Sequence, residues 1–267
     1  MAEKPAKNTA ARSATSEIDR MPRGGPEASC LDRLLQSDRQ SDASTDVARR
    51  RGVIRALQLT GGWFGSTERF AEVALAEVED IADPRILELG AGNGELSRKL
   101  LDWHPSARLT VTDMDAAAVA AMAASDLGAH PRAKVRALDA TAIDAADGSF
   151  DLAVFALSFH HLPPAAAVRA FAEGTRVADT LLIIDLPRPP SPLHVIRLAT
   201  VLPFARLLPL VRDGVATSLR CYSPSALRAL AEHADPAVEV ELRGGPLSPQ
   251  VVVARRADAA PRSNDQR

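Results

Sequence analysis

The chain has 267 residues, 46% of them hydrophobic and 25% charged, which is enough to bury one substantial core. Its formal net charge is -2 and its isoelectric point is about 6.3, so it lacks the basic field that nucleic-acid binding needs. The two cysteines, Cys30 and Cys221, have neither metal-site nor disulfide spacing, and no secretory signal is recognisable. We therefore expect a reduced, cytoplasmic protein of one domain that binds neither nucleic acid nor a metal.

Residues 1–44 and 257–267 are rich in small, charged and turn-forming residues and show almost no apolar periodicity. Such segments cannot bury enough surface to offset the entropy cost of ordering, so both are predicted to be disordered tails. After the first tail, two helices are predicted within residues 45–82, joined by a loop that contains Trp63 and Phe64. These two aromatic side chains either pack the helices together or face a bound ligand.

Residues 85–89 are rich in branched apolar side chains and predict a short buried strand. Glycines follow at Gly90, Gly92 and Gly94, and helical spacing resumes directly afterwards. A strand, a glycine turn and a helix in this order let the backbone approach a ligand closely. A dinucleotide fingerprint has two residues between its second and third glycines, whereas here one residue separates them. Glu88 would repel a pyrophosphate, but it suits a ligand that carries positive charge.

Two further predicted strands each end at an acidic residue. Residues 107–112 lead into Asp113, and residues 134–138 lead into Asp139. Asp113 lies about twenty residues after the glycines, where an acid is placed to accept hydrogen bonds from ribose hydroxyls. The role of helix cap falls to Asp115 instead. For Asp139, an ordinary structural role in a loop is nearly as good an explanation as a role in binding.

A fourth, continuous apolar strand is predicted over residues 150–156, as expected in a sheet covered on both faces. It runs into a loop that carries adjacent histidines, and a fifth strand is predicted over residues 180–185. The carboxyl ends of parallel strands meet at one edge of a sheet, which is where open α/β sheets bind ligands. The groups expected to meet there are Glu88, Asp113, Asp139 and the 156–161 loop.

After the fifth strand the chain departs from a minimal α/β domain. Residues 187–222 are rich in proline and contain an apolar run that is too interrupted by charged residues to span a bilayer. They are predicted to form a helical cap. Ser223 and Pro224 then begin a helix as N-cap and first helical residue. Residues 238–242 and 251–254 are predicted to be the last strands.

The Glu-x-Gly-x-Gly-x-Gly pattern of residues 88–94 resembles motif I of the class I S-adenosylmethionine-dependent methyltransferases. Residues 150–162 are similar to the motif that follows the family's adenine loop, and the resemblance covers residues 85–186 well. It implies that residues 45–256 form one Rossmann-like, doubly wound α/β domain. The sheet would have seven strands, mostly parallel with an antiparallel last strand, together with N-terminal helices and a helical cap after strand five.

The same resemblance implies S-adenosyl-L-methionine as the cofactor. In the family, the acid that closes the second strand holds both ribose hydroxyls, and Asp113 matches it. An acid after the third strand usually lies near the adenine amino group, and Asp139 matches it. The expected cofactor-binding residues are Glu88, Gly90, Ala91, Gly92, Gly94, Asp113, Met114, Asp139, Ala140 and Ala156.

Methyl transfer from a sulfonium requires alignment of the nucleophile with the methyl group, and it requires a base only when the acceptor is protonated. The candidate catalytic residues are His160, His161 and Tyr222. The histidine pair has an alternative role in packing or in supporting the cofactor loop. The expected substrate-binding residues are Trp63, Phe64, His194, Arg197, Arg220 and Tyr222.

The class of acceptor is narrowed by three absences from the sequence. There is no Asn-Pro-Pro-Tyr signature of amino-nitrogen methylation, Cys221 is not preceded by the proline of a cytosine C5 nucleophile, and no basic, aromatic-studded stripe is visible. What remains is a small apolar or amphipathic molecule, methylated on oxygen or carbon. The resemblance is closest to quinone-biosynthesis-like and polyketide-tailoring methyltransferases.

Two functions of other classes compete with this interpretation. A nucleotide-dependent oxidoreductase would need the glycine spacing of a pyrophosphate site, which is lacking. A non-catalytic module would bind S-adenosylmethionine and show no turnover with any acceptor. For the apolar run of residues 187–222, the alternatives to an acceptor pocket are a homodimer interface and a peripheral membrane contact.

Overall fold

The computed structural model describes Ile18, residues 21–26, Ala28, and residues 67–188, 217–245 and 248–257. Several predicted features lie outside these residues: the helix that precedes the glycines at 61 and 62, Trp63, Phe64, His194, Arg197 and most of the predicted cap. Within the described part of the chain, no helix is long and apolar enough to cross a membrane.

Seven strands form one sheet in the order β3-β2-β1-β4-β5-β7-β6. The first five strands run parallel, and β7 is antiparallel to both of its neighbours, β5 and β6. This is the predicted Rossmann-like topology, with strand order reversing between β1 and β4. The strands are β1 (Arg85–Leu89), β2 (Arg108–Asp113), β3 (Ala133–Ala137), β4 (Phe150–Ala156), β5 (Ala178–Asp185), β6 (Val238–Arg243) and β7 (Gln250–Arg256).

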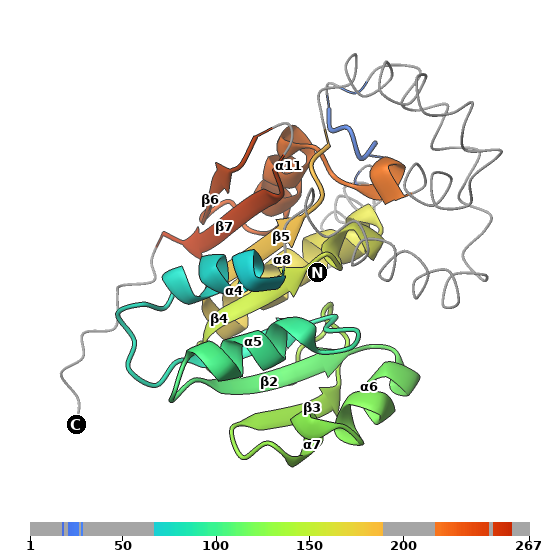
Figure 1. Cartoon of the computed structure of the whole chain (residues 1–267). Coiled ribbons are helices and arrows are strands. Elements are labelled where there is room, and N and C mark those ends of the chain that lie inside the picture. Colours follow the sequence, from blue (N-terminus) through green and yellow to red (C-terminus); the bar gives the residue numbers. More distant parts are fainter. Residues whose placement is uncertain are drawn as a thin grey trace, which may run out of the picture.

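Helices cover both faces of the sheet, as the continuous apolar strands require. Figure 1 shows α4 (Thr67–Ala76) and α5 (Glu95–Trp103) in front of the sheet, and α8 (Pro164–Val177) and α11 (Pro224–Ala234) behind it. The short helices α6 (Ala116–Ala123) and α7 (Asp126–Ala129) connect β2 to β3 and pack on the same face as α4 and α5.

The core forms two buried clusters, one on each face of the sheet. On the α8 side, three phenylalanine rings meet edge to face. The ring centroid of Phe159 lies 5.2 Å from that of Phe155 and 5.3 Å from that of Phe171. Such edge contacts add to the stabilisation from burying the rings. Because Phe159 belongs to the loop after β4, this packing anchors the loop to the core.

The helix starts follow the predicted capping chemistry. Asp115 accepts a hydrogen bond from the backbone N–H of Ala117 at the start of α6. Ser223 accepts one from Ala226 at the start of α11, where Pro224 occupies the first helical position. The buried face of α8 continues past Phe171 to Val177, directly before β5.

An N-terminal segment, made up of Ile18, residues 21–26 and Ala28, docks on the domain. Ile18 and Ala28 are each only 8% exposed, and Ile18 belongs to the α8-side core. The sequence analysis expected a disordered tail over residues 1–44, and for this segment the structure differs. The reason is contact with distant residues, because the segment has no apolar periodicity that would predict docking.

Candidate functional site

The glycine turn after β1 is tied to the loop that follows β4. Gly90 has a positive φ of 70°, and a Cβ atom there would lie 2.9 Å from the Cβ of Ser158. The Ser158 hydroxyl donates a hydrogen bond of 2.9 Å to the backbone carbonyl of Leu89. Leu157, beside it, is the single non-glycine residue of the described chain with a positive φ. The turn and the loop therefore form one compact edge, with local strain at its centre.

Gly92 leaves open space at the carboxyl edge of the sheet. Its φ is 61°, and a Cβ built there would meet no atom within 4 Å. Its backbone N–H donates a hydrogen bond of 2.9 Å to the Asp113 Oδ2 atom. A bare backbone with free space above it is what the close approach of a ligand requires.

Asp113 ends β2 beside this open turn, as predicted. Its Oδ1 atom accepts a hydrogen bond of 2.9 Å from the backbone N–H of Asp115, and its Oδ2 atom holds Gly92. Each carboxylate oxygen has two acceptor positions, so both retain capacity for a ligand hydroxyl. Met114, the next residue, is 73% exposed and presents an apolar side chain at the same strand end.

Glu88 lies inside the core rather than open at the edge. It is 2% exposed, and the Ser97 hydroxyl on α5 donates a hydrogen bond to its carboxylate. Burial raises the pKa of Glu88 to about 7, opposed by the hydrogen bond from Ser97. The sequence analysis matched this acid to a cationic ligand. Among the described residues, the Glu88 side chain hydrogen-bonds to Ser97, so its effect on a ligand at the turn would be electrostatic.

The other expected cofactor residues occupy the ends of β3 and β4. Asp139 is exposed, and its Oδ1 atom accepts hydrogen bonds of 2.8 Å from both the backbone N–H and the hydroxyl of Thr141. These contacts are those of a loop cap, the alternative that the sequence left open. Ala140 and Ala156 are half-buried at the same edge, so neither blocks access to it.

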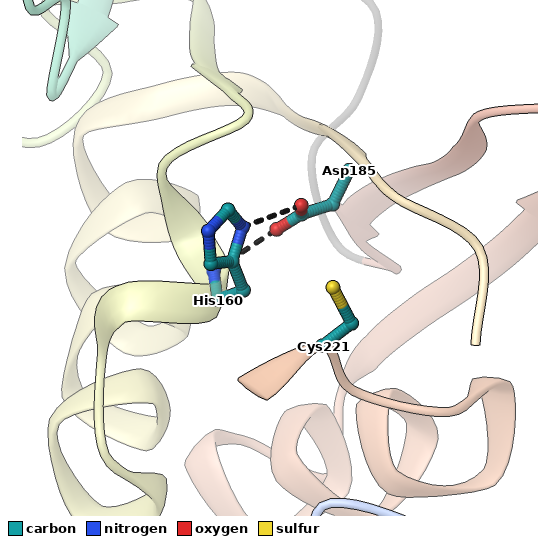
Figure 2. A group of neighbouring side chains, drawn as sticks. All are labelled: His160, Asp185 and Cys221. Carbon is teal, nitrogen blue, oxygen red and sulfur yellow. Dashed lines mark hydrogen bonds and ion pairs between the residues drawn. The ribbon is translucent and has the colours of Figure 1, made fainter. Parts of the chain in front are cut away.

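His160 is held by Asp185, the last residue of β5. The Nδ1 atom of His160 lies 2.7 Å from the Oδ1 atom of Asp185, and its backbone N–H donates a bond of 2.9 Å to Oδ2. Leu186 donates a further backbone bond of 2.8 Å to Oδ1. An ionised carboxylate only accepts hydrogen bonds, so Nδ1 carries a proton, and in the neutral imidazole the second ring nitrogen then has the lone pair. Figure 2 shows that second nitrogen pointing away from Asp185 and Cys221.

Tyr222 is buried behind this pair. Its hydroxyl donates a hydrogen bond of 2.6 Å to the backbone carbonyl of Leu162, and its ring packs against Phe159 at 5.9 Å between centroids. Burial raises the pKa of Tyr222 to about 12, so its phenolate is a poor candidate for a base near neutral pH. His161 is half-buried and stacks on the His160 ring at 4.2 Å between centroids. Arg220 is half-buried on the same side.

His160, Asp185 and Cys221 place their ligand atoms within 4.8 Å of one another (Figure 2). A metal ion here would have to displace the bond between His160 Nδ1 and Asp185. It would also meet the positive charge of Arg23, which interacts electrostatically with both Asp185 and Cys221. The contacts are therefore those of a hydrogen-bonded histidine–carboxylate pair, in which the carboxylate orients the imidazole.

Asp185 and Arg23 are the site residues that the sequence analysis missed. Asp185 closes the fifth strand as Asp113 closes the second, so the same rule about strand ends would have found it. Arg23 gives no such signal, because its partners lie more than a hundred positions away along the chain.

One cavity of about 670 Å³ lies at the opposite edge of the sheet, lined by Arg85, Arg108 and Lys134 among others. A smaller cavity of about 230 Å³ lies between α4 and the β5–β7 edge, lined by Phe70 and Ile184 among others. No predicted site residue lines either of them. The carboxyl edge carries the glycine turn and the strand-end acids, so we place the site there despite the larger cavity.

Comparison with known proteins shows which family part of the chain resembles. Residues 86–180 match the family described as a methyltransferase domain. Residues 86–180 therefore carry a methyltransferase domain. The open turn at Gly92, the acceptor positions on Asp113 and the exposed Met114 are compatible with S-adenosylmethionine as the ligand.

Among curated proteins, the methyltransferase domain is 38% identical over 105 residues to the malonyl-[acyl-carrier protein] O-methyltransferase of Geobacter sulfurreducens. The matched part is 39% of this chain and 38% of that relative's length. It therefore spans well under half of the relative.

Two solved structures show the same fold. An O-methyltransferase from Planctomyces limnophilus in complex with apigenin has a TM-score of 0.57 at 17% identity, covering 84% of this chain and 66% of that one. The plantazolicin methyltransferase BpumL, solved with a substrate analogue and S-adenosylhomocysteine, has a TM-score of 0.56 at 11% identity. That comparison covers 92% of this chain and 99% of the other.

Proposed function

We propose that the protein transfers the methyl group of S-adenosylmethionine to an oxygen or carbon of a small apolar or amphipathic molecule. The observation that carries this proposal is the strand-end carboxylate of Asp113 beside the open glycine turn at Gly92. A carboxylate at that place accepts hydrogen bonds from ribose hydroxyls, and the turn leaves room for the rest of the ligand. Glu88, Gly90, Ala91, Gly94, Met114, Asp139, Ala140 and Ala156 would complete the cofactor site around this pair.

The acceptor would lie over the carboxyl ends of β4 and β5, beside the cofactor residues on β1 and β2. His160 is the best-placed base among the candidates, because Asp185 fixes the ring so that the second nitrogen can accept a proton. Such a base serves an oxygen acceptor and an enolisable carbon alike, since both have to lose a proton during transfer. Tyr222 and Arg220 would shape the acceptor side rather than move protons.

The remaining expectations on partners belong to the same proposal. Trp63, Phe64, His194 and Arg197 would complete the acceptor pocket, and they lie outside the described residues. A homodimer interface or a peripheral membrane contact is the competing use of the apolar run in residues 187–222.

Calorimetry with S-adenosylhomocysteine tests the cofactor, with NADH as the competing ligand. We expect S-adenosylhomocysteine to bind and NADH to give no heat. Binding of NADH alone would support the oxidoreductase alternative and refute the proposal. Turnover is then measured with tritiated methyl donor against a panel of phenols, alcohols and carboxylic acids. Cofactor binding without transfer to any of them would favour a non-catalytic module.

A further inference from the structure

Arg23 of the N-terminal segment lies at the centre of a junction between segments far apart in the sequence. Its Nη1 atom donates a hydrogen bond of 2.6 Å to the backbone carbonyl of His160 and another to that of Arg220. Its Nη2 atom donates a bond of 3.0 Å to the carbonyl of Leu162. One side chain thus joins the loop after β4 to the segment that leads into α11.

The Arg23 guanidinium also packs against an aromatic ring and interacts with nearby ionisable groups. Its central carbon lies 4.6 Å from the ring centroid of Tyr222, over the ring face. Burial lowers the pKa of the Arg23 guanidinium, while Tyr222, Cys221 and Asp185 act in the opposite direction. A buried charge is costly unless its donors are hydrogen-bonded, and both terminal nitrogens of Arg23 donate to backbone carbonyls. The Arg23 side chain is therefore a buried, hydrogen-bonded part of the domain and not a surface side chain.

The backbone around Arg23 is fixed as well. The N–H of Ser223 donates a bond of 2.9 Å to the Arg23 carbonyl, and the Ser223 hydroxyl donates one of 2.8 Å to the Gly24 carbonyl. Gly25 has a φ of +87°, and a Cβ atom there would lie 2.5 Å from the Ser225 hydroxyl oxygen and 2.9 Å from the Ala226 nitrogen. Only glycine permits this approach to the start of α11. Figure 1 shows the segment in blue beside the helical turn of residues 217–220.

The junction reaches the candidate catalytic pair directly. Asp185 holds the backbone N–H and the ring of His160, and Arg23 holds its carbonyl. The peptide groups on both sides of His160 are therefore fixed by side chains from β5 and from the N-terminal segment.

We propose that the N-terminal segment is a clamp on the acceptor side of the site, and that Arg23 is a positioning residue that sets His160 through its carbonyl. This rests on the proposed function, because it assigns the acceptor side to the ends of β4 and β5. Arg23 lies over the ring of Tyr222 and interacts electrostatically with the neighbouring Cys221, which is 1% exposed. Opening the clamp exposes that cysteine and loosens the His160–Asp185 bond.

The test uses full-length protein in a Cys30→Ser background, in which Cys221 is the one remaining thiol. The variants are Arg23→Ala, Arg23→Lys and Gly25→Ala. Arg228→Ala, an exposed arginine on α11, is the matched control for charge. Gly245→Ala is the control for glycine, because a Cβ there meets nothing closer than 3.7 Å.

The first readout is the rate at which a thiol reagent labels Cys221. Loss of the three hydrogen bonds that the Arg23 side chain donates, or a steric clash at residue 25, should raise the population of the open clamp, and with it the labelling rate, by at least about ten- to a hundredfold. We expect this for Arg23→Ala and Gly25→Ala and not for either control. Millimolar ethylguanidinium should slow labelling of Arg23→Ala again, whereas ethylammonium, with the same charge but no planar fork, should not. Arg23→Lys should label at an intermediate rate.

The second readout follows the His160 Nδ1 proton, whose bond to Asp185 gives a downfield proton NMR signal. We expect the signal to be lost through solvent exchange in Arg23→Ala and to return with ethylguanidinium. Unchanged labelling and an unchanged Nδ1 signal in Arg23→Ala would overturn the clamp. A folded wild type that fails to bind S-adenosylhomocysteine would instead refute the proposed function, and it would leave the labelling result standing.

Discussion

Replacing the buried acid Glu88 by glutamine should make the protein less sensitive to alkaline pH. Glu88 is 2% exposed beneath α5, and burial raises its pKa from 4.5 to about 7. The folded protein therefore holds a proton that the unfolded chain releases. The stability that this group contributes is complete below about pH 4.5 and is lost as the pH rises through 7.

The size of the effect follows from the shift. A change of about 2.5 pKa units corresponds to about 3 kcal/mol between acidic pH and pH 8. Glutamine carries no charge at either pH and keeps an oxygen for Ser97, although its amide group costs about 1 kcal/mol to place. Glu88→Gln should therefore be about 2 kcal/mol more stable than the wild type at pH 8. For a domain of this size that raises the Tm by about 4–8 °C.

Thermal unfolding at pH 5 and pH 8 measures this difference. At pH 5 the wild type and Glu88→Gln should melt within a few degrees of each other. Glu72→Gln, an exposed change on α4, should show no such gain at pH 8. If the gap between Glu88→Gln and wild type were the same at both pH values, Glu88 would be ionised in the fold without penalty, and the reasoning from burial would be wrong.

Three further substitutions test the site and the core. Asp113→Ala should weaken S-adenosylhomocysteine binding by about ten- to a hundredfold in calorimetry, since a charged acceptor of hydrogen bonds is worth about 1.5–3 kcal/mol; equal affinity would remove Asp113 from the site. Asp185→Asn should lower the free energy of unfolding in urea by about 1–3 kcal/mol, because His160 and Leu186 donate their backbone N–H groups to different carboxylate oxygens and the amide nitrogen of asparagine can accept neither bond in place of the lost oxygen. An unaltered urea midpoint would show that the pair is loosely held. Phe171→Ala, at a fully buried position 5.3 Å from the Phe159 ring, should cost about 3–5 kcal/mol in the same assay, and a loss under 1 kcal/mol would mean that the loop after β4 repacks freely.

The sequence predicts the sheet well because its signals are local. Each strand is a short apolar run bounded by turn residues, and the caps at Asp115 and Ser223 act within three residues. The contact between Asp113 and Gly92 can also be predicted from the sequence, since both residues lie within one strand–helix–strand unit. Family resemblance and backbone rules therefore agree on this half of the site.

For Glu88, the sequence motif predicts the residue type but not the environment of its side chain. The pattern predicts an acid two residues before the first glycine, but it does not say which face of β1 the side chain occupies. Side chains alternate along a strand, and Glu88 shares its face with Ile86, beneath α5. The resulting desolvation and the bond from Ser97 depend on helix packing, which spacing alone does not reveal.

Deleting the first 28 residues tests the clearest difference between sequence and structure. A disordered tail could be removed with a change in Tm of no more than a degree or two, because it has no buried face to lose. In the structure, deletion removes the buried Ile18 side chain and the donors that Arg23 gives to the carbonyls of His160 and Leu162. After subtracting the entropy of ordering the segment, we expect a net loss of about 2–3 kcal/mol, which lowers the Tm by about 4–12 °C. S-adenosylhomocysteine affinity should change little, because Asp113 and the glycine turn lie on β1 and β2. An unchanged Tm would mean that the segment is part of the disordered tail that composition predicts, since nothing in its own sequence favours docking over disorder.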